Sequence, residues 1–205
     1  MGSRTAQEPD WQRLRDVLAA EPHLVSLGHV ACLALVVSVA AGCMGRNGHV
    51  YRVPSSSMEP TLHCGRPQLG CRGREADLVY AVPYGDGRPS RGDIVVFETP
   101  RAAELRCGSG GIFIKRVIGL GGERWQERAG TILIDGQRLN EPWLRPNFRD
   151  SLSSRGSRIP ADSYLLLGDN RGSSCDSRFF GPVPRQKLRG KVVEIKRGSE
   201  RIHLR

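Results

Sequence analysis

The sequence predicts a mainly β fold, in which a single N-terminal transmembrane helix precedes an antiparallel β-sheet domain of coiled or barrel-like shape. Three observations support this prediction. Seven short β-prone runs follow one another after residue 76, the 25 glycines and 13 prolines favour many turns, and one segment of 21 residues carries no formal charge. Short strands bounded by Gly and Pro clusters are typical of all-β domains.

The uncharged segment covers residues 24–44 and predicts a membrane anchor. As a helix rising ~1.5 Å per residue it would span roughly 31 Å, the thickness of a hydrocarbon core. A cleaved secretory signal is disfavoured by the long, partly acidic stretch that precedes it. A lipoprotein signal that ends at Cys43 is disfavoured because the sequence lacks the leucine expected three residues before this cysteine. A buried core helix is disfavoured because such a helix would seldom be so uniformly apolar. The predicted order is therefore a tail over 1–23, the anchor over 24–44, a linker over 45–50 and a folded domain over 51–205.

The folded domain is predicted to consist of short strands joined by turns and two larger loops. The β-prone runs cover residues 77–82, 93–97, 112–120, 123–127, 131–134, 164–167 and 192–196. Asp135-Gly136 is the signal of a tight hairpin turn. Residues 102–111 and 140–160, rich in small and polar side chains, are predicted to be exposed loops.

The net charge of +10 comes from an arginine excess, with 27 arginines and four lysines. A basic surface can bind nucleic acid or anionic membranes. The arginines are spread along the chain instead of forming a tail or one helix face, which favours a solvated basic surface over nucleic-acid binding. Attraction to a membrane surface stays open as a secondary effect.

Six cysteines divide into two sets. Cys32 and Cys43 lie in the apolar segment, where a thiol behaves as a small hydrophobe. The other four permit three disulfide pairings, and spacing alone does not choose among them. They are Cys64, Cys71, Cys107 and Cys175. Their spacing does not fit a zinc knuckle, so disulfides in an oxidising compartment are expected and a metal site is not.

Three segments contain residue types that can carry chemistry. They are 54–62 (PSSSMEPTL), 112–119 (IFIKRVIG) and 168–178 (GDNRGSSCDSR). The second places Lys115 in an apolar, β-branched run, where an ammonium is costly unless it is paired or neutralised. Taken singly, each segment also fits a structural role, as a serine-rich turn, a strand whose lysine faces solvent, or a polar turn held by Asp–Arg pairs.

Together the three segments predict a serine nucleophile with a lysine base. A serine hydroxyl needs a base, and none of the five histidines has a sequence context that suits this role. Burial can lower a lysine pKa from ~10.4 toward neutrality, and a change of about three pKa units corresponds to roughly 4 kcal/mol. The neutral amine then needs an acceptor other than a carboxylate, because a carboxylate would restore its charge. Ser174 is a candidate for this acceptor, whereas Asp169, Asp176 and Arg178 would hold the shape of the loop.

With these segments the chain resembles the type I (leader) signal peptidases, membrane serine–lysine proteases that remove signal peptides from exported proteins. The resemblance covers residues 53–197 and rests on four motifs in family order: P-S-x-S-M-x-P-T-L, R-G-D-I-V-V-F, K-R-V-I-G-x-x-G and G-D-N-R-x-x-S-x-D-S-R. It implies a β domain of the signal peptidase type, with Ser57 as nucleophile and Lys115 as general base. It further implies an oxyanion hole formed by the Ser55 hydroxyl and the Ser57 N–H, and a lysine oriented by Ser174.

The same resemblance implies a single-pass protein of the cell membrane, with a cytoplasmic N-terminus and an extracytoplasmic catalytic domain. The expected partners are the lipid bilayer and preproteins with small residues at −1 and −3 of their signal peptides; no nucleic acid and no cofactor are expected. Shallow pockets would receive the small side chains, and an exposed strand edge would pair with the extended substrate. The pocket residues implied are Val53, Met58, Leu62, Phe113 and Ile114.

Two features depart from the family pattern. Gly121 stands where the family usually has proline, and Cys107 and Cys175 are not general family features. Because these cysteines lie beside two site segments, we expect them to form a bridge that ties the base-bearing strand to the loop orienting its lysine. Cys64 and Cys71 would then close a short turn after the nucleophile motif. This pairing follows from proximity to the site and not from a spacing rule.

Other functions compete with this interpretation. A maturation protease of the pilus or conjugation type would differ in substrate and not in chemistry. Self-cleaving repressor peptidases also use Ser and Lys, but they are soluble and lack the third segment. A non-catalytic, membrane-anchored basic protein would bind nucleic acid or anionic lipid instead. A short distance between Ser57 Oγ and Lys115 Nζ would distinguish a protease from a binding protein, because a binding protein has no need of that pair.

Overall fold

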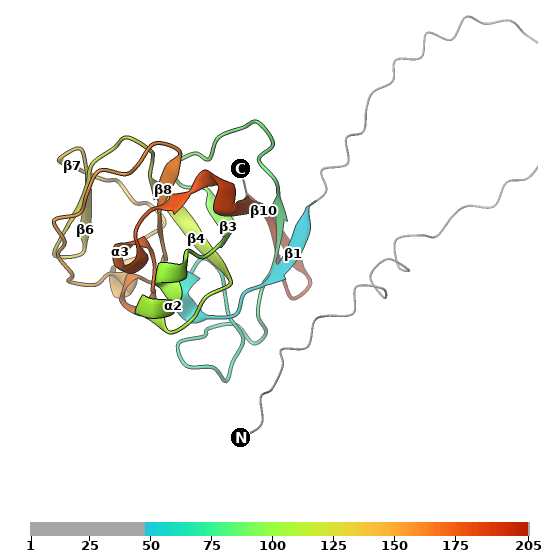
Figure 1. Ribbon diagram of the computed structural model, residues 1–205. Coiled ribbons are helices and arrows are strands. Elements are labelled where there is room, and N and C mark those ends of the chain that lie inside the picture. The colour runs from blue at the N-terminus through green and yellow to red at the C-terminus, as the bar shows by residue number, and fades with distance from the viewer. Residues whose placement is uncertain (1–47, 205) are drawn as a thin grey trace, which may run out of the picture. The chain divides into compact units, whose positions relative to one another are not determined.

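The computed structural model describes residues 48–204, and antiparallel strands dominate them (Figure 1). The predicted tail and the membrane anchor over 24–44 lie outside the described residues. Within residues 48–204, no helix is long and apolar enough to cross a membrane. The strands are β1 His49–Arg52, β2 Leu78–Val82, β3 Ile94–Glu98, β4 Ile112–Gly119, β5 Trp125–Arg128, β6 Thr131–Ile134, β7 Gln137–Arg138, β8 Ser163–Leu167, β9 Val183–Pro184, β10 Leu188–Arg197 and β11 Glu200–His203.

Helical segments are short and lie in the connections. The α-helices are α2 Arg101–Cys107 and α3 Ser177–Phe180, and the 3-10 turns are η1 Ser56–Met58, η2 Pro146–Phe148, η3 Arg171–Ser173 and η4 Arg185–Lys187. Three of these elements, η1, η3 and α3, fall in or beside the segments that the sequence analysis singled out for chemistry.

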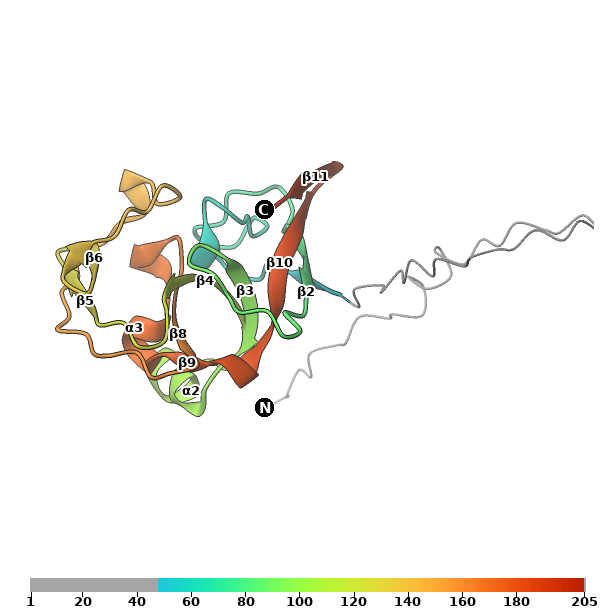
Figure 2. The ribbon, with the colours of Figure 1, turned by 90° about the horizontal axis from the view of Figure 1, so that it is seen from above.

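The larger sheet has eight strands, in the order β1-β2-β10-β3-β4-β8-β9 with β11 added to β10. Its pairings are antiparallel, and β10 joins β2 to β3 through bulges near Val192 and Leu188. Strands β5, β6 and β7 form a separate three-stranded sheet. Figure 2 shows the larger sheet curving from β2 and β10 through β3 and β4 to β8, with β5 and β6 set to one side. The mainly β, antiparallel architecture agrees with the prediction.

Each of the seven predicted β-prone runs overlaps a strand. The hairpin between β6 and β7 is also confirmed, since Asp135 and Gly136 have φ angles of 49° and 82° between paired strands. Two positive φ angles in a two-residue loop are the requirement of a type I′ turn, which Asp-Gly meets with little strain.

The boundaries of two predicted irregular segments were wrong. Residues 49–50, assigned to a linker, belong to β1, which pairs with β2 from His49 onward. The predicted loop over 102–111 begins with α2, because Arg-Ala-Ala-Glu-Leu-Arg is a run of good helix formers with Ala103 fully buried. Gly108 ends this helix in the left-handed conformation, at φ 68°.

The loop over 140–160 is less exposed than predicted. Leu144 and Ile159 are buried, and the buried Glu141 forms an ion pair with the fully buried Arg171. The loop is therefore fixed to the 168–178 segment, and its polar composition did not reveal these anchor points.

The central strands of the larger sheet are buried on both faces. Side chains alternate across a strand, and in β3 both Val96 and Val95 are fully buried, in different apolar clusters. β8 likewise alternates between two clusters, with Leu166 in one and Leu165 in the other. β4 lies between these two strands. Lys115, in the middle of β4, is accordingly only 3% exposed.

Candidate active site

The segment over 54–62, which carries Ser57, directly follows β1. Ser57 lies in η1 and its side chain is buried, at 9% exposure. Asn170 holds this turn from the 168–178 loop, since its backbone N–H donates to Ser57 O and its Nδ2 to Ser56 O, both at 3.1 Å. Val53 N–H donates to Asp77 O at 2.9 Å and fixes the start of the segment.

Lys115 reaches Ser57 from the middle of β4. The distance between Lys115 Nζ and Ser57 Oγ is 2.7 Å, and the lysine is 3% exposed. Burial lowers the pKa of Lys115 to about 8, although the carboxylates of Asp176 and Asp169 act to raise it. At that pKa a substantial fraction of the amine is neutral in mildly alkaline solution, and a neutral amine can accept the proton of the Ser57 hydroxyl.

Ser55 lies beside the nucleophile, two residues before it. Its Oγ is 3.2 Å from Ser57 Oγ and donates a hydrogen bond to it. Ser57 Oγ is therefore contacted by two polar groups, with the Lys115 amine on one side and the Ser55 hydroxyl on the other. The structure thus places a hydroxyl donor directly beside Ser57 Oγ.

Ser174 is buried near this pair, but its Oγ has no hydrogen-bond partner among residues 48–204. The second polar contact of Lys115 Nζ is Ile114 O, at 3.1 Å. Ser174 Oγ and Ser57 O both lie close against Gly168, where a Cβ would come within 2.2 Å and 2.4 Å of them. Gly168 thus lets the third segment approach the nucleophile turn closely.

The three residues expected to hold the shape of the loop are tied by short ion pairs. Asp169 accepts two hydrogen bonds from Arg116, from Nε at 2.9 Å and from Nη2 at 2.6 Å. Asp176 caps α3 and accepts from Arg178 Nε at 2.8 Å. Arg178 also donates to Asp150 at 2.5 Å and to Arg171 O at 2.8 Å. These contacts join the loop to β4 and to the 140–160 segment.

A cavity of about 340 Å³ opens beside Ser57 and Lys115. Four of the five expected pocket residues line it, namely Val53, Met58, Phe113 and Ile114. Leu62 does not line it, because this side chain is fully buried in the core beneath the nucleophile turn. Wall residues that the sequence analysis did not identify are Pro54, Ser109, Gly110, Ile112, Ser173 and Cys175.

One edge of β4 is free next to this cavity. β4 pairs with β3 from Ile112 to Arg116, but its pairing with β8 begins only at Arg116. No strand within residues 48–204 therefore pairs with the backbone of residues 112–115 on their β8 side. An extended peptide can add to such an edge, with alternate side chains directed into the cavity.

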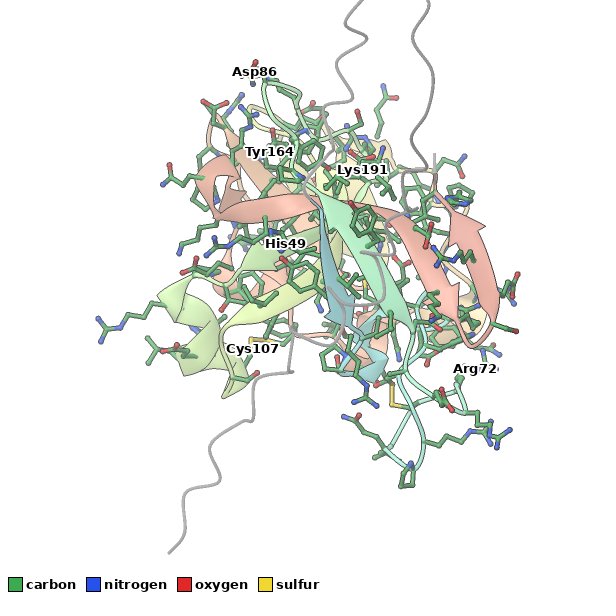
Figure 3. All side chains as sticks on the ribbon, turned by 90° about the vertical axis from the view of Figure 1, so that its right-hand side faces the viewer. His49, Arg72, Asp86, Cys107, Tyr164 and Lys191 are labelled. Atoms are coloured by element: carbon green, nitrogen blue, oxygen red, sulfur yellow. A yellow bond between two sulfur atoms is a disulfide. The ribbon has the colours of Figure 1, made fainter. Side chains whose placement is uncertain are left out.

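Both expected disulfides are present, Cys64–Cys71 with a Cα separation of 4.9 Å and Cys107–Cys175 with 5.9 Å. Figure 3 shows their sulfur bonds near the label of Cys107 and in the loop that carries Arg72. Cys175 follows Ser174 and lines the cavity. The second bridge thus joins the end of α2 to the loop beside the Ser57–Lys115 pair.

Two residues that the sequence analysis did not assign support the nucleophile turn. One is Asn170, which is described above. The other is Glu59, which is fully buried and contacts His63 Nδ1 at 2.6 Å and the backbone N–H of Arg72 at 3.0 Å. A glutamate inside the otherwise apolar or small PSSSMEPTL run could have pointed to a buried carboxylate, although not to its hydrogen-bond partners.

Among the described residues, no group of three or more His, Cys, Asp or Glu side chains is placed to hold a metal ion. The chemistry that the arrangement offers comes from its own side chains: a buried hydroxyl, an amine with a lowered pKa and a second hydroxyl beside them.

We expect loss of the Cys107–Cys175 bridge to lower kcat/KM by about 10- to 100-fold, because small displacements of an active-site loop have effects of this size. The double variant Cys107→Ser/Cys175→Ser should fold, which its Tm reports, and each single variant should match it in kcat/KM. Dithiothreitol should lower the activity of the wild type. Any loss of activity that it still causes in the double variant reports the reduction of Cys64–Cys71 alone. Full activity of the folded double variant would show that the bridge does not position the site.

Comparison with known proteins places these residues in context. The model of the signal peptidase family, peptidase S26, matches residues 25–196. Signal peptidase I of Leptolyngbya laminosa is 36% identical over 194 residues, which cover 93% of this chain and 88% of that protein. Signal peptidase I of Bacillus caldolyticus is 32% identical over 154 residues, or 69% of this chain and 75% of that protein. A crystal structure of a signal peptidase I from Enterococcus faecalis is 31% identical with a TM-score of 0.42, and the match covers 51% of this chain and 97% of that one.

Proposed function

The chain belongs to the signal peptidase family, peptidase S26, which is a family of serine proteases, and we propose that it cleaves signal peptides from preproteins with Ser57 as nucleophile and Lys115 as general base. The observation that carries this proposal is the 2.7 Å contact between Lys115 Nζ and Ser57 Oγ in a buried site. Among the described residues no histidine contacts Ser57. His63 instead contacts Glu59, and His203 lies near Glu194.

In the proposed reaction, neutral Lys115 takes the proton of the Ser57 hydroxyl as Oγ attacks the scissile carbonyl carbon. The carbonyl oxygen becomes an oxyanion, which accepts hydrogen bonds from the Ser57 N–H and from the Ser55 hydroxyl. The Lys115 ammonium then gives its proton to the leaving amine, and the C–N bond breaks. Water, deprotonated by Lys115, hydrolyses the resulting ester and restores Ser57.

Ser174 has an orienting role in this proposal. Its buried hydroxyl lacks a partner among residues 48–204, and a buried polar group without a partner is costly. A hydrogen bond to the Lys115 amine during turnover would satisfy it. As a neutral acceptor, Ser174 would direct the amine without raising its pKa as a carboxylate would.

The cavity and the free edge of β4 support an extended substrate with small side chains. We assign the −1 and −3 side chains to the cavity that Val53, Met58, Phe113 and Ile114 line. The substrate backbone would pair with residues 112–115 of β4. Small residues at these two positions are the usual mark of a signal-peptide cleavage site.

The proposed location is the outer face of the cell membrane, with residues 24–44 as a single anchor and the N-terminus in the cytoplasm. Only 12 residues separate Met44 from Ser57. A chain of that length reaches at most ~3.3–3.6 Å per residue, so the nucleophile would work close to the bilayer. Cleavage sites of signal peptides lie at the membrane edge, which suits this placement.

The test is cleavage of a preprotein by the purified full-length chain in detergent or vesicles. We expect one product whose new N-terminus, read by mass spectrometry, follows a small-x-small sequence, and no product from Ser57→Ala. A preprotein with a bulky residue at −1 serves as the matched control and should stay intact. Cleavage at unrelated positions, or none by the wild type, would contradict the proposed function.

A further inference from the structure

The loop that carries Ser174 comes very close to the Ser57 turn at Gly168. A Cβ on this glycine would lie 2.2 Å from Ser174 Oγ and 2.4 Å from Ser57 O. Both backbone groups of the glycine are held by side chains. Its N–H donates to Asp176 Oδ2 at 3.1 Å, and its carbonyl oxygen accepts from Arg171 Nε at 3.1 Å. The place of Gly168 beside the nucleophile therefore depends on the side chain of Arg171.

Arg171 is in turn held by Glu141, from the loop over 140–160. Both side chains are buried, and the guanidinium donates to both carboxylate oxygens, from Nη1 to Oε2 at 3.3 Å and from Nη2 to Oε1. One arginine side chain thus joins the Glu141 carboxylate to the Gly168 carbonyl. The neighbouring Arg178 has three carboxylate partners of its own, namely Glu127, Asp150 and Asp176.

A buried ion pair such as Glu141–Arg171 is weak evidence for a role in stability. The cost of taking both charges out of water offsets their attraction, and apolar side chains of similar volume often serve equally well. What an arginine offers in addition is direction, because its planar guanidinium presents its donors in a fixed fork. The pair therefore sets the geometry of the groups that it joins.

The chain around Glu141 also contacts β4 beside the general base. Trp143, two residues after Glu141, has its ring centroid 4.7 Å from the guanidinium carbon of Arg116. Arg116 directly follows Lys115 in β4, and it pairs with Asp169 at 2.6 Å. Residues 141–143 therefore contact both the strand that carries the base and the loop that lies against the nucleophile turn.

We propose that Glu141 is a positioning residue of the active site, which acts through Arg171 on the carbonyl of Gly168. A fixed Gly168 keeps its loop against the Ser57 turn and so maintains the 2.7 Å distance between Ser57 Oγ and Lys115 Nζ. The inference rests on the proposed function, because it concerns the same pair of residues, but one of its two tests needs no cleavage.

The first test measures kcat and KM of full-length variants on a short soluble peptide. Glu141→Gln keeps the shape of the side chain and removes the charge that holds Arg171. It should lower kcat by about tenfold, because small displacements in an active site have effects of this size, and change KM by less than about twofold. Glu123→Gln is the matched control, since Glu123 pairs with Arg91 and not with the loop beside Ser57. Its kcat should equal that of the wild type.

A double variant separates positioning from stability. Glu141→Leu/Arg171→Met replaces the ion pair by apolar side chains, so its Tm should lie within about 3 °C of the wild type. Its kcat should nevertheless stay about tenfold low, because the Gly168 carbonyl has lost its donor. A double variant in which both Tm and kcat equal those of the wild type would overturn the proposal, as would an unchanged kcat in Glu141→Gln. The double variant also decides the matter if Glu141→Gln does not fold.

The second test uses full-length Ser57→Cys protein and the rate at which iodoacetamide alkylates position 57 at pH 7, read by mass spectrometry of the peptide that contains it. An ammonium beside a thiol favours the reactive thiolate, so Lys115→Met should slow the alkylation by about fivefold. Glu141→Gln should slow it by about threefold while Lys115 is present, because the amine is then misplaced. In the Lys115→Met background Glu141→Gln should have no further effect, and Glu123→Gln should have none in either background.

The two backgrounds distinguish the possible outcomes. Equal effects of Glu141→Gln with and without Lys115 would mean that it changes access to position 57 and not the geometry of the pair, and would overturn the proposal. The expected pattern in a protein that cleaves no preprotein would reject the proposed function and keep the positioning role. Cleavage by the wild type, with no effect of Glu141→Gln on alkylation, would reject the positioning role alone.

Discussion

We expect replacing Lys115 by methionine to lower kcat by about 10⁴-fold, the upper range of what a positioned general base contributes. Methionine keeps most of the buried volume and removes the amine that lies 2.7 Å from Ser57 Oγ. Lys115→Ala should fail equally. Lys115→Arg should fail as well, because a guanidinium is not deprotonated in proteins. Single-turnover cleavage of a soluble peptide measures the loss, and Tm shows whether each variant is folded.

The pH dependence of the cleavage rate tests whether Lys115 is the base, because a lysine with only a structural role would not impose its pKa on the rate. The base is active when neutral, and burial lowers the pKa of Lys115 to about 8. The rate should therefore rise through pH 8 and be about tenfold below its plateau at pH 7. A rate that is flat between pH 6.5 and 9.5 in the wild type, or substantial turnover by folded Lys115→Met, would remove this mechanism.

A double variant tests whether Ser57 and Lys115 work as one unit. Residues that act together in catalysis are strongly non-additive, so Lys115→Met should cost little in a Ser57→Ala background. The same substitution should leave the fold stable, since it removes a buried amine whose protonation folding disfavours. Independent, additive losses would indicate that Lys115 acts on something other than the nucleophile.

The strands were predictable because their residues carry a local signal. Runs such as 131–134, followed by Asp135-Gly136, combine β-branched residues with a turn that only a few dipeptides form without strain. α2 was missed because its seven residues are followed by a glycine-rich stretch, and composition averaged over 102–111 hides a short helix. The first two residues of β1 were placed in a linker because a four-residue strand at a sheet edge has little pattern of its own and depends on pairing with β2.

The part of the site that consists of motif residues was predictable from the sequence. Ser57 and Lys115 could be chosen because a serine and an unusually placed lysine are meaningful only together. Leu62 could not be separated from the true wall residues, since sequence does not show which apolar side chains face a cavity and which face the core. Ser109 and Gly110 escaped notice because they reach the cavity only through the position of α2, which is a tertiary effect.

Most of what the sequence did not predict is the set of contacts that hold the turn carrying Ser57. The buried Glu59 and the two hydrogen bonds from Asn170 join segments that are up to 114 residues apart. No local pattern announces such contacts, because each residue alone also fits an ordinary turn. The structure adds them to the site by bringing the 168–178 loop against η1.

Replacing Ser55 by alanine should lower kcat by about 10²–10³-fold and change KM little, the usual effect of removing one oxyanion-hole donor. In the resting site the Ser55 hydroxyl donates to Ser57 Oγ at 3.2 Å, so it has to turn to the substrate oxygen as Ser57 attacks. Its contribution therefore arises in the transition state and not in substrate binding. Ser55→Thr keeps the hydroxyl and should restore most of the rate, whereas Ser56→Ala, at the neighbouring serine, should have a small effect. Pre-steady-state cleavage of a soluble peptide separates kcat from KM. A Ser55→Ala enzyme with raised KM and unchanged kcat would place Ser55 in substrate binding, and the backbone N–H of Ser57 would then serve the oxyanion without it.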